Sequence, residues 1–145
     1  MPGIDDLFGG MRIASTGLTA ERTRIDVITE NIANARTTRT ASGEPYRRKM
    51  VLFEPLLQKA IGGRPQEAGA GLAPPRVIED YDTPFEVIED AGHPHADAEG
   101  KVTYPNVNTV VEMADLITAM RAYEANLAAQ ENFVRMAERA LQLAR

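Results

Sequence analysis

The stretch that decides the fold of this chain is residues 109–144, which read TVVEMADLITAMRAYEANLAAQENFVRMAERALQLA. Apolar side chains recur through it at alternating intervals of three and four residues, which is the pattern of a coiled-coil seam. The members of this seam are Met113, Leu116, Met120, Tyr123, Leu127, Gln130, Val134, Ala137 and Leu141. The pattern predicts a helix that ends near Ala144 and is roughly 50 Å long.

The start of this helix is marked by the sequence Thr109-Val-Val-Glu112, which has the form of a capping box. In such a box the threonine hydroxyl accepts a hydrogen bond from the amide three residues on, and the glutamate reaches back. We therefore expect Thr109 to cap the helix and the Glu112 side chain to be engaged at the same helix end.

A second helical stripe lies at the N-terminus, where apolar residues again fall on one face at intervals of three and four. Its members are Met11, Ala14, Leu18, Ile25, Ile28, Ile32 and Ala35, with Glu21 as the polar interruption. The pair Gly9-Gly10 predicts that the regular helix starts near Met11, and it should end near Asn34. Gly17 is a further weak point, because glycine costs about 1 kcal/mol relative to alanine inside a helix. We expect this helix to be the one that forms last.

The middle of the chain has no sustained helical period. Short strands are expected at 50–53, 76–78 and 85–88, and the last two flank residues 80–84 as a small hairpin. Residues 90–104 are expected to form a loop. Four glycines and three prolines in residues 62–75 predict a flexible linker.

These observations divide the chain into an N-terminal helix (1–35), an irregular β and loop insertion (36–106) and a C-terminal helix (107–145). The predicted fold is therefore mainly α, with the two long terminal helices packed as an antiparallel coiled-coil pair around a small β-containing insertion. In the simplest register Asn34 lies level with Thr109, which brings Glu21 beside Arg121. Periodicity leaves open whether the outer faces are covered by the insertion, by a homodimer or by other proteins.

Composition excludes several classes of protein. The chain has 145 residues, a net charge of −5 and no cysteine. It therefore lacks the basic surface typical of nucleic-acid binding and has no disulfide or thiolate site. No segment has the roughly 20 apolar residues of a membrane span, and the acidic start Met-Pro-Gly-Ile-Asp-Asp does not resemble a cleavable signal peptide. We expect no direct membrane insertion.

Candidate chemical sites are weak throughout. His93 and His95 lie near carboxylates, but His-Pro-His has no helical metal-ligand spacing, and a plain turn is the favoured interpretation. Ser15 and Ser42 belong to no recognisable nucleophile motif, and there is no glycine-rich phosphate loop. We predict no catalytic residue, no cofactor and no metal, and hence a protein that is not an enzyme.

Charge is unevenly distributed along the insertion. Five basic residues lie between Ala33 and Lys49, whereas residues 76–100 contain eight acids and one base. These segments are either two solvated surfaces or complementary patches that attract stacked copies head to tail. In the second interpretation Arg47 and Arg48 contact a neighbouring subunit.

Six segments resemble known sequences. The segments ASTGLTA (14–20) and ITENIANA (28–35) resemble the N-terminal motif of the flagellar rod, hook and axial protein family. PYRRK (45–49), DAGHPHADAEG (90–100), YPNVN (104–108) and RAYEAN (121–126) are similar to the proximal rod subtype within that family. The resemblance covers both ends and most of the middle of the chain.

The resemblance implies a structural subunit of the bacterial flagellum that serves motility. Such a subunit is exported by the flagellar type III apparatus without a cleaved signal and joins a periplasmic rod in the basal body. There it assembles with other rod proteins and copies of itself into a helical tube that transmits torque. The main alternative is a homo-oligomeric coiled-coil adaptor, which would be a stable helical dimer or trimer by itself.

Periodicity and resemblance together select candidate subunit-interface residues. On physical grounds Asn31 and Asn34 are capping or turn residues, and the resemblance adds bonds to a neighbour. Arg121 and Asn126 are candidate hydrogen-bonding residues beside Tyr123. The full set of interface candidates is Leu18, Ile25, Ile28, Asn31, Ile32, Asn34, Arg47, Arg48, Met113, Leu116, Met120, Arg121, Tyr123, Asn126, Leu127, Val134 and Leu141.

Overall fold

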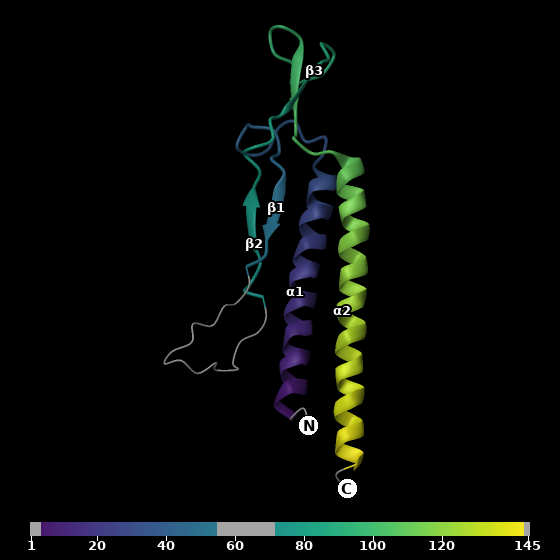
Figure 1. Ribbon diagram of the computed structural model, residues 1–145. Coiled ribbons are helices and arrows are strands. Elements are labelled where there is room, and N and C mark those ends of the chain that lie inside the picture. Colours follow the sequence, from purple (N-terminus) through teal and green to yellow (C-terminus); the bar gives the residue numbers. More distant parts are fainter. Residues whose placement is uncertain (1–3, 55–71, 144–145) are drawn as a thin grey trace, which may run out of the picture. The chain divides into compact units, whose positions relative to one another are not determined.

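The computed structural model describes residues 4–54 and 72–143, and it contains two long helices and four short strands in that part of the chain (Figure 1). The elements in chain order are α1 (Ile4–Ala33), β1 (Lys49–Leu52), β2 (Arg76–Glu79), β3 (Glu86–Glu89), β4 (Lys101–Tyr104) and α2 (Thr109–Leu143). The predicted class, mainly α with a small β-containing insertion, is confirmed. Most of the predicted linker, residues 62–71, lies outside the described residues.

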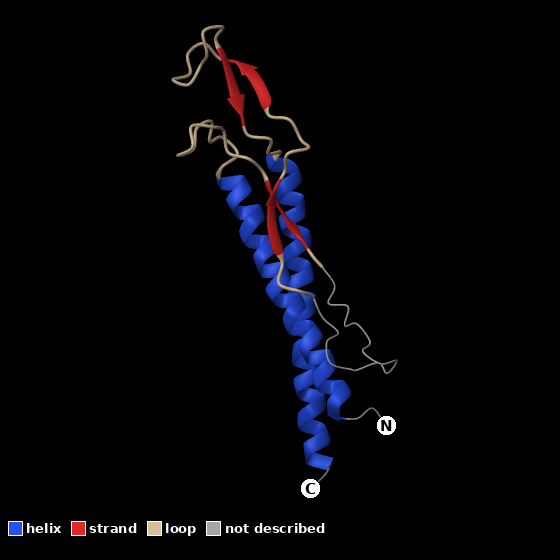
Figure 2. Ribbon diagram, turned by 90° about the vertical axis from the view of Figure 1, so that its left-hand side faces the viewer, coloured by secondary structure: helices blue, strands red, loops and turns tan. Residues whose placement is uncertain are grey.

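The described residues fall into two compact units, and each contains a stretch of both helices. The first unit comprises residues 4–23, 52–54, 72–76 and 118–143, and the second comprises 24–51 and 77–117. Within each unit α1 packs against α2, and the two helices run in opposite directions (Figures 1 and 2). The antiparallel helix pair is therefore confirmed in both units.

Three contacts define the register of this pair. Gly10 faces Phe133 and Gly17 faces Asn126 in the first unit, while Asn31 bonds to Glu112 in the second. Each contact is displaced from the next by seven or fourteen residues on both helices, as heptad packing requires. The predicted register is confirmed. The pairing of Glu21 with Arg121 that this register suggests stays a prediction.

The two glycines of these contacts explain why the predicted start of the first helix, Met11, is wrong. A Cβ atom added to Gly10 would lie 2.5 Å from Cζ of Phe133, and one added to Gly17 would lie 3.0 Å from Nδ2 of Asn126. The first distance is shorter than real Cβ contacts, and the second is tight enough that the Asn126 side chain would have to shift. Glycine thus weakens the isolated helix but permits close packing in the folded unit, and α1 continues through it to Ile4.

The face that α2 turns toward α1 also differs from the predicted seam. Its contact line runs through Glu112, Asn126 and Phe133, each one position before a predicted seam residue. Leu116, Tyr123, Gln130 and Ala137 are half-buried, as the seam predicts. The remaining seam positions are 42–67% exposed and are Met113, Met120, Leu127, Val134 and Leu141. These five residues are called the α2 stripe below.

The cap of α2 is one residue earlier than predicted. The Asn108 side chain accepts hydrogen bonds through Oδ1 from the amides of Val110 and Val111, at 3.1 and 3.2 Å. These are the second and third residues of the helix, the positions that a capping side chain normally serves. The predicted capping box at Thr109 is therefore wrong. The Glu112 side chain bonds to Asn31 and Arg48 instead.

The strands form two separate antiparallel pairs rather than the predicted hairpin between residues 76 and 88. β2 pairs with β1, and the ladder is extended by a bond from the Asp80 amide to the Arg48 carbonyl, 2.8 Å. β3 pairs with β4, with Glu86 opposite Tyr104 and Glu89 opposite Lys101. β4 lies in a segment that was predicted to be a loop. The four residues of β4 follow an Asp-, Gly- and Pro-containing stretch whose composition obscured the strand signal.

Leu72 and Ala73, shortly before β2, are anchored within the first unit. The Leu72 amide donates to the Thr16 hydroxyl at 3.3 Å, and the Ala73 amide donates to the Glu54 carbonyl at 2.9 Å. Among the described residues, neither helix has a stretch that is sufficiently long and apolar to span a membrane.

Candidate functional site

Asn31 is the centre of a buried polar cluster in the second unit. Its side chain is 1% exposed, and all of its hydrogen-bonding capacity is used within the chain. Nδ2 donates to the Lys49 carbonyl at 2.9 Å and to Oε2 of Glu112 at 3.0 Å. Oδ1 accepts from the Tyr46 hydroxyl at 3.0 Å and from the Lys49 amide at 2.9 Å. One amide side chain thus connects α1, β1 and α2.

Glu112 is the second centre of this cluster and is also 1% exposed. Its Oε1 accepts a hydrogen bond from Nε of Arg48 at 2.6 Å, and Nη1 of Arg48 lies 3.6 Å from Oδ2 of Asp80. Burial by itself would lower the pKa of Arg48, but the hydrogen bond and charge of Glu112 outweigh this effect and raise it. The buried carboxylate of Glu112 is therefore both neutralised and hydrogen-bonded.

Asn106 completes the cluster from the segment that precedes α2. Its Oδ1 accepts from the Arg48 amide at 2.8 Å, and its Nδ2 donates to the carbonyls of Asp80 and Thr83 at 3.1 and 3.0 Å. We call Asn31, Tyr46, Arg48, Asp80, Asn106 and Glu112 the Asn31 cluster. The cluster joins the end of α1, the start of α2 and both strands of the β1–β2 pair.

The protonation states of the cluster suit a structural role. Burial, and then the charge of Glu30, raise the pKa of Tyr46, so its phenol stays protonated and donates to Asn31. Each polar group is held by other groups of the same chain, which leaves no poised acid, base or nucleophile in the cluster. What the arrangement can do is hold the insertion and the two helices in one geometry.

The carboxylate of Asp80 makes this geometry sensitive to pH. The backbone and hydroxyl of Thr83 donate to it at 3.0 and 2.8 Å, and these bonds, with those of Asp82 and the charge of Arg48, hold the pKa of Asp80 below its ordinary value. A lowered carboxyl pKa stabilises the fold above the unfolded-state pKa, about 3.9, and this stability is lost as pH falls through the folded-state pKa.

We therefore expect the free energy of unfolding to fall more steeply with acidification below about pH 4 in the native chain than in Asp80→Asn. Chemical denaturation at pH 7 and at several values between pH 5 and pH 2.5 measures this difference. Asp82→Asn, which changes an exposed carboxylate in the same turn, is the matched control. Equal pH dependence of the native chain and Asp80→Asn would contradict the assignment.

The structure separates the predicted interface residues into three groups. Asn31 and Arg48 bond to Glu112 inside the chain, and Ile28 is buried. The half-buried residues are Leu18, Ile25, Ile32, Asn34, Arg47, Leu116, Tyr123 and Asn126. The exposed residues are Arg121 and the α2 stripe.

Asn34 has the local role that helix physics predicts. Its Nδ2 donates to the Glu30 carbonyl at 2.9 Å, and its Oδ1 accepts from the Thr37 hydroxyl at 3.2 Å. The Glu30 carbonyl also accepts from the Asn34 amide at 3.0 Å, so the side chain of Asn34 reinforces the last turn of α1 and joins it to Thr37. The two asparagines of one motif thus differ: Asn31 connects distant segments, and Asn34 closes a helix end.

Three of the basic residues in the predicted charge pairing, Arg47, Arg48 and Lys49, already make contacts within the second unit. Arg48 is paired with Glu112, and Nζ of Lys49 lies 2.5 Å from Oε1 of Glu30. The Arg47 guanidinium lies over the rings of Tyr81 and Phe85, at 4.4 and 4.2 Å from their centroids. Reversal of these three charges would therefore damage the monomer as well as any contact with a neighbour.

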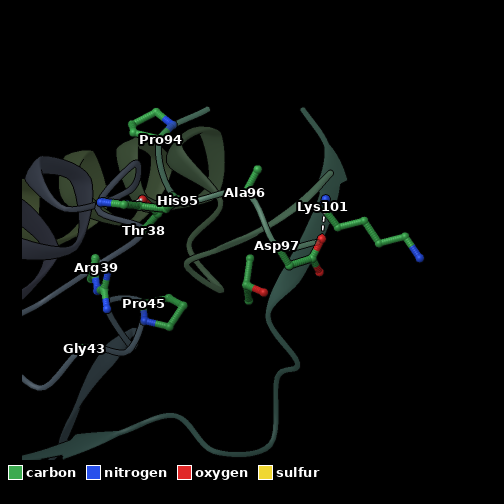
Figure 3. A pocket seen from close by; sticks show the side chains of 10 residues that line it. Thr38, Arg39, Gly43, Pro45, Pro94, His95, Ala96, Asp97 and Lys101 are labelled. Atoms are coloured by element: carbon green, nitrogen blue, oxygen red, sulfur yellow. Dashed lines mark hydrogen bonds between the residues drawn. The ribbon is translucent and has the colours of Figure 1, made fainter. Parts of the chain in front are cut away.

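A surface pocket of about 350 Å³ lies in the second unit between the loop after α1 and the loop before β4 (Figure 3). Nδ1 of His95 is hydrogen-bonded to the Thr38 hydroxyl at 2.8 Å, and Oδ1 of Asp97 accepts from the Lys101 amide at 2.7 Å. The Asp97 side chain serves its own turn, whereas His95 joins two loops that are distant in the sequence. Within residues 4–54 and 72–143, no three His, Asp or Glu side chains are grouped to share a metal ion.

Sequence reasoning missed most of the Asn31 cluster. Tyr46, Asp80 and Asn106 lie in segments that read as turns or loops, and Glu112 was assigned to a helix cap. No periodicity marks a buried polar residue, because its partners lie far away in the chain. The available signal was the density of polar residues beside short apolar runs, as in Tyr46-Arg-Arg-Lys49 and Tyr104-Pro-Asn106.

Comparisons with known proteins agree on one group of relatives. A model of the family "Flagella basal body rod protein" matches residues 11–39, and "Flagellar basal body rod FlgEFG protein C-terminal" matches residues 98–143. The flagellar basal-body rod protein FlgC of Borreliella burgdorferi is 43% identical over 131 residues, which cover 83% of this chain and 86% of the relative. FlgC of Bacillus subtilis is 38% identical over 147 residues, covering 94% and 97%. FlgC of Escherichia coli O157:H7 is 37% identical over 115 residues, covering 79% and 81%.

Proposed function

The chain belongs to the family of the flagellar basal-body rod protein FlgC, and on this premise we propose that it assembles by covering its α2 stripe with helices of neighbouring rod subunits. It is a structural subunit of the flagellar basal-body rod. Copies of this chain and other rod proteins would form a helical tube, and packing between their helices would transmit torque along it. The rod lies in the basal body, and we propose that this part of it is periplasmic.

The α2 stripe is the observation that carries this proposal. Five large apolar side chains recur every seven residues along one helix and stay 42–67% exposed. Full burial of one such side chain stabilises a structure by about 1.5–3 kcal/mol. A second chain that covered the row would therefore gain a continuous contact with heptad spacing, as helices do in coiled coils. Scattered exposed apolar residues would offer no such continuous contact.

Export without a cleaved signal is proposed from the chemistry of the chain and its family. The absence of cysteine means that no disulfide has to be opened before the chain is threaded through a channel. The helix pair gains cover only from neighbours along the α2 stripe, which favours completion of the fold at the site of assembly. The flagellar type III apparatus is accordingly the proposed export partner.

A catalytic role is not part of the proposal. The titratable groups of the Asn31 cluster are paired within the chain, and His95 is bonded to Thr38. Such arrangements position backbone segments and leave no free acid or base beside a nucleophile. The alternative from another class is a free-standing homo-oligomeric adaptor, for which the same α2 stripe would pair with itself.

The double variant Leu127→Lys with Val134→Lys tests the proposal. Burial of two charges in a subunit contact is strongly unfavourable, so we expect rod assembly and swimming to fall at least tenfold in cells that carry only this variant. The control is Ala125→Lys with Asn132→Lys, which places the same charges at exposed α2 positions with the same spacing. Motility is scored in soft agar, and assembly is scored by the yield of basal bodies that retain a rod.

Sedimentation of the purified native chain separates the two functions. A rod subunit should sediment as a monomer at micromolar concentration, whereas an adaptor should be a dimer or trimer that the Leu127→Lys, Val134→Lys variant dissociates. Normal rods in cells carrying this variant, together with a stable native oligomer in solution, would overturn the proposal in favour of the adaptor.

A further inference from the structure

The β3–β4 hairpin has two outer edges whose backbone groups can be assigned from the register. In an antiparallel pair, opposite residues alternate between those that exchange hydrogen bonds and those that point their backbone groups outward. The Asp90 amide donates to the Gly100 carbonyl at 2.9 Å, and Ile88 lies opposite Val102 in the same register. The amides and carbonyls of Val87 and Glu89 on β3 therefore point outward, as do those of Lys101 and Thr103 on β4.

The outer edge of β4 is partly closed by its own chain. The Asp97 amide donates to the Lys101 carbonyl at 2.9 Å, and the Lys101 amide donates to Oδ1 of Asp97 at 2.7 Å. For the outward groups of Val87 and Glu89, the described part of the chain contains no comparable partner. β3 is therefore the more open edge of this hairpin, since on β4 the outward groups of Lys101 have partners.

The side chains of β3 make this edge both apolar and acidic. All four residues of the strand are exposed, with Val87 at 59% and Ile88 at 42%. Glu86 and Glu89 flank the apolar pair, and Asp90 follows. A two-stranded ribbon with an exposed strand is marginal in water and gains from a third strand. Unlike charges opposite each other across strands stabilise such a pairing, and like charges oppose it.

We propose that β3 is a strand-addition site that binds an extended segment of a neighbouring rod subunit bearing Lys or Arg next to apolar residues. The inference rests on the proposed function, because the partner is a rod subunit. The incoming strand would bond to the amides and carbonyls of Val87 and Glu89. Because successive side chains alternate between the faces of a strand, its basic side chains would lie against Glu86 on one face or against Glu89 on the other. Main-chain bonds supply the affinity in this mode of recognition, and side chains supply the selectivity.

The charges argue against a second copy of β3 as the occupant. Antiparallel pairing of two such strands through their outward groups, with Val87 opposite Glu89, would set Glu86 opposite Asp90 on both sides of the pair. Two like-charge contacts oppose this dimer. Acidic residues are also a common means of keeping exposed edges unpaired, and that role predicts no binding of a basic strand.

A peptide assay on the purified full chain separates these cases. The probe is an acetylated hexapeptide of alternating lysine and valine, and its control is the same peptide with methylated backbone amides. The control keeps the charge but cannot form a strand. Proton–nitrogen correlation spectra should show shifts at Val87 and Glu89 with the probe, slower hydrogen exchange of both amides, and no such change at Thr103. Equal shifts with the methylated peptide, shifts centred on Thr103, or no shift at all would overturn the proposal.

The variant Val87→Pro tests the edge directly. Proline removes the outward amide of residue 87 but none of the bonds to β4, and edge strands tolerate proline at such positions. We expect probe affinity to fall about tenfold, from the lost bond and the ring that occupies its place. Val87→Thr keeps the amide and is the matched control. Glu86→Lys should reverse the preference, so that a peptide of alternating glutamate and valine binds better than the lysine probe.

A measurement in assembled basal bodies serves if a variant chain fails to fold alone. A photoreactive amino acid at Val87 should crosslink to a Lys- or Arg-containing extended segment of another rod subunit, identified by mass spectrometry of the linked peptides. The same reagent at Thr103 is the control. A crosslink from Val87 to a helical or acidic segment, or none, would overturn the inference. The Leu127→Lys, Val134→Lys variant should still bind the probe, which distinguishes failure of this site from failure of the assembly stripe.

Discussion

Replacement of Glu112 by alanine is expected to lower the free energy of unfolding by about 3 kcal/mol. The side chain is 1% exposed and holds both Arg48, at 2.6 Å, and Asn31, at 3.0 Å. Its removal leaves a largely buried guanidinium without its main partner and an amide with an unused donor. This value is at the lower end of the range of about 3–5 kcal/mol for breaking a buried ion pair. The reason is that the Asp80 carboxylate, 3.6 Å from Arg48, still partly neutralises the guanidinium.

Urea denaturation followed by far-ultraviolet circular dichroism measures this loss. Glu124→Ala, at an exposed position of the same helix, controls for the effect of alanine on helix propensity and should change stability by less than about 0.5 kcal/mol. Glu112→Gln should be intermediate, because its carbonyl still accepts a bond from Asn31 while the charge opposite Arg48 is lost. A loss below about 1 kcal/mol for Glu112→Ala would show that the buried carboxylate is not a main support of the fold.

Replacement of Asn31 by leucine is expected to be at least as damaging, at about 4 kcal/mol. Leucine has the same branching as asparagine but is larger, so no cavity forms, and the loss comes from the missing hydrogen bonds with a contribution from overpacking. The substitution deprives the Tyr46 hydroxyl, the Lys49 amide and carbonyl, and Oε2 of Glu112 of their partner at once. A buried polar group left without a partner costs about 1–3 kcal/mol, and some of these groups can partly reorient.

Asn34→Leu is the matched control, since it makes the same change three residues later in the same motif. Asn34 bonds only to Glu30 and Thr37 near the end of α1, so we expect a loss of about 1 kcal/mol or less. A double-mutant cycle with Asn31→Leu and Glu112→Ala should show a coupling energy of about 1 kcal/mol or more, because the two side chains contact each other. Equal effects of the two asparagine variants would contradict the assigned difference.

These two predictions concern the part of the molecule that sequence reasoning recovered least. The terminal helices, their antiparallel pairing and their register were all predictable, because each rests on apolar periodicity sustained over many turns. The short strands at 50–53, 76–78 and 85–88 were found within one residue at most of their ends. Their pairing was not predictable, because a four-residue strand carries too little pattern to select its partner.

The errors on the helices share one cause. Gly10 and Gly17 indicate a helix start and a weak point in the sequence because propensity describes an isolated helix, whereas in the folded unit Phe133 and Asn126 lie so close that glycine packs best there. The predicted α2 seam is also partly wrong, because the row that faces α1 lies one position before the residues of the α2 stripe. A helix with apolar residues on two adjoining rows offers two faces, and only the partner helix selects which row is buried.

The sequence by itself determined that two long helices exist, that they run antiparallel, and that the chain has apolar surface beyond what one pair can cover. These properties depend on residues close together in the chain and on their period. Only the tertiary structure decided that Glu112 supports the Asn31 cluster instead of capping a helix, and that the α2 stripe remains exposed. Both outcomes depend on side chains brought together from distant segments, where hydrogen-bond satisfaction and close packing override local preference.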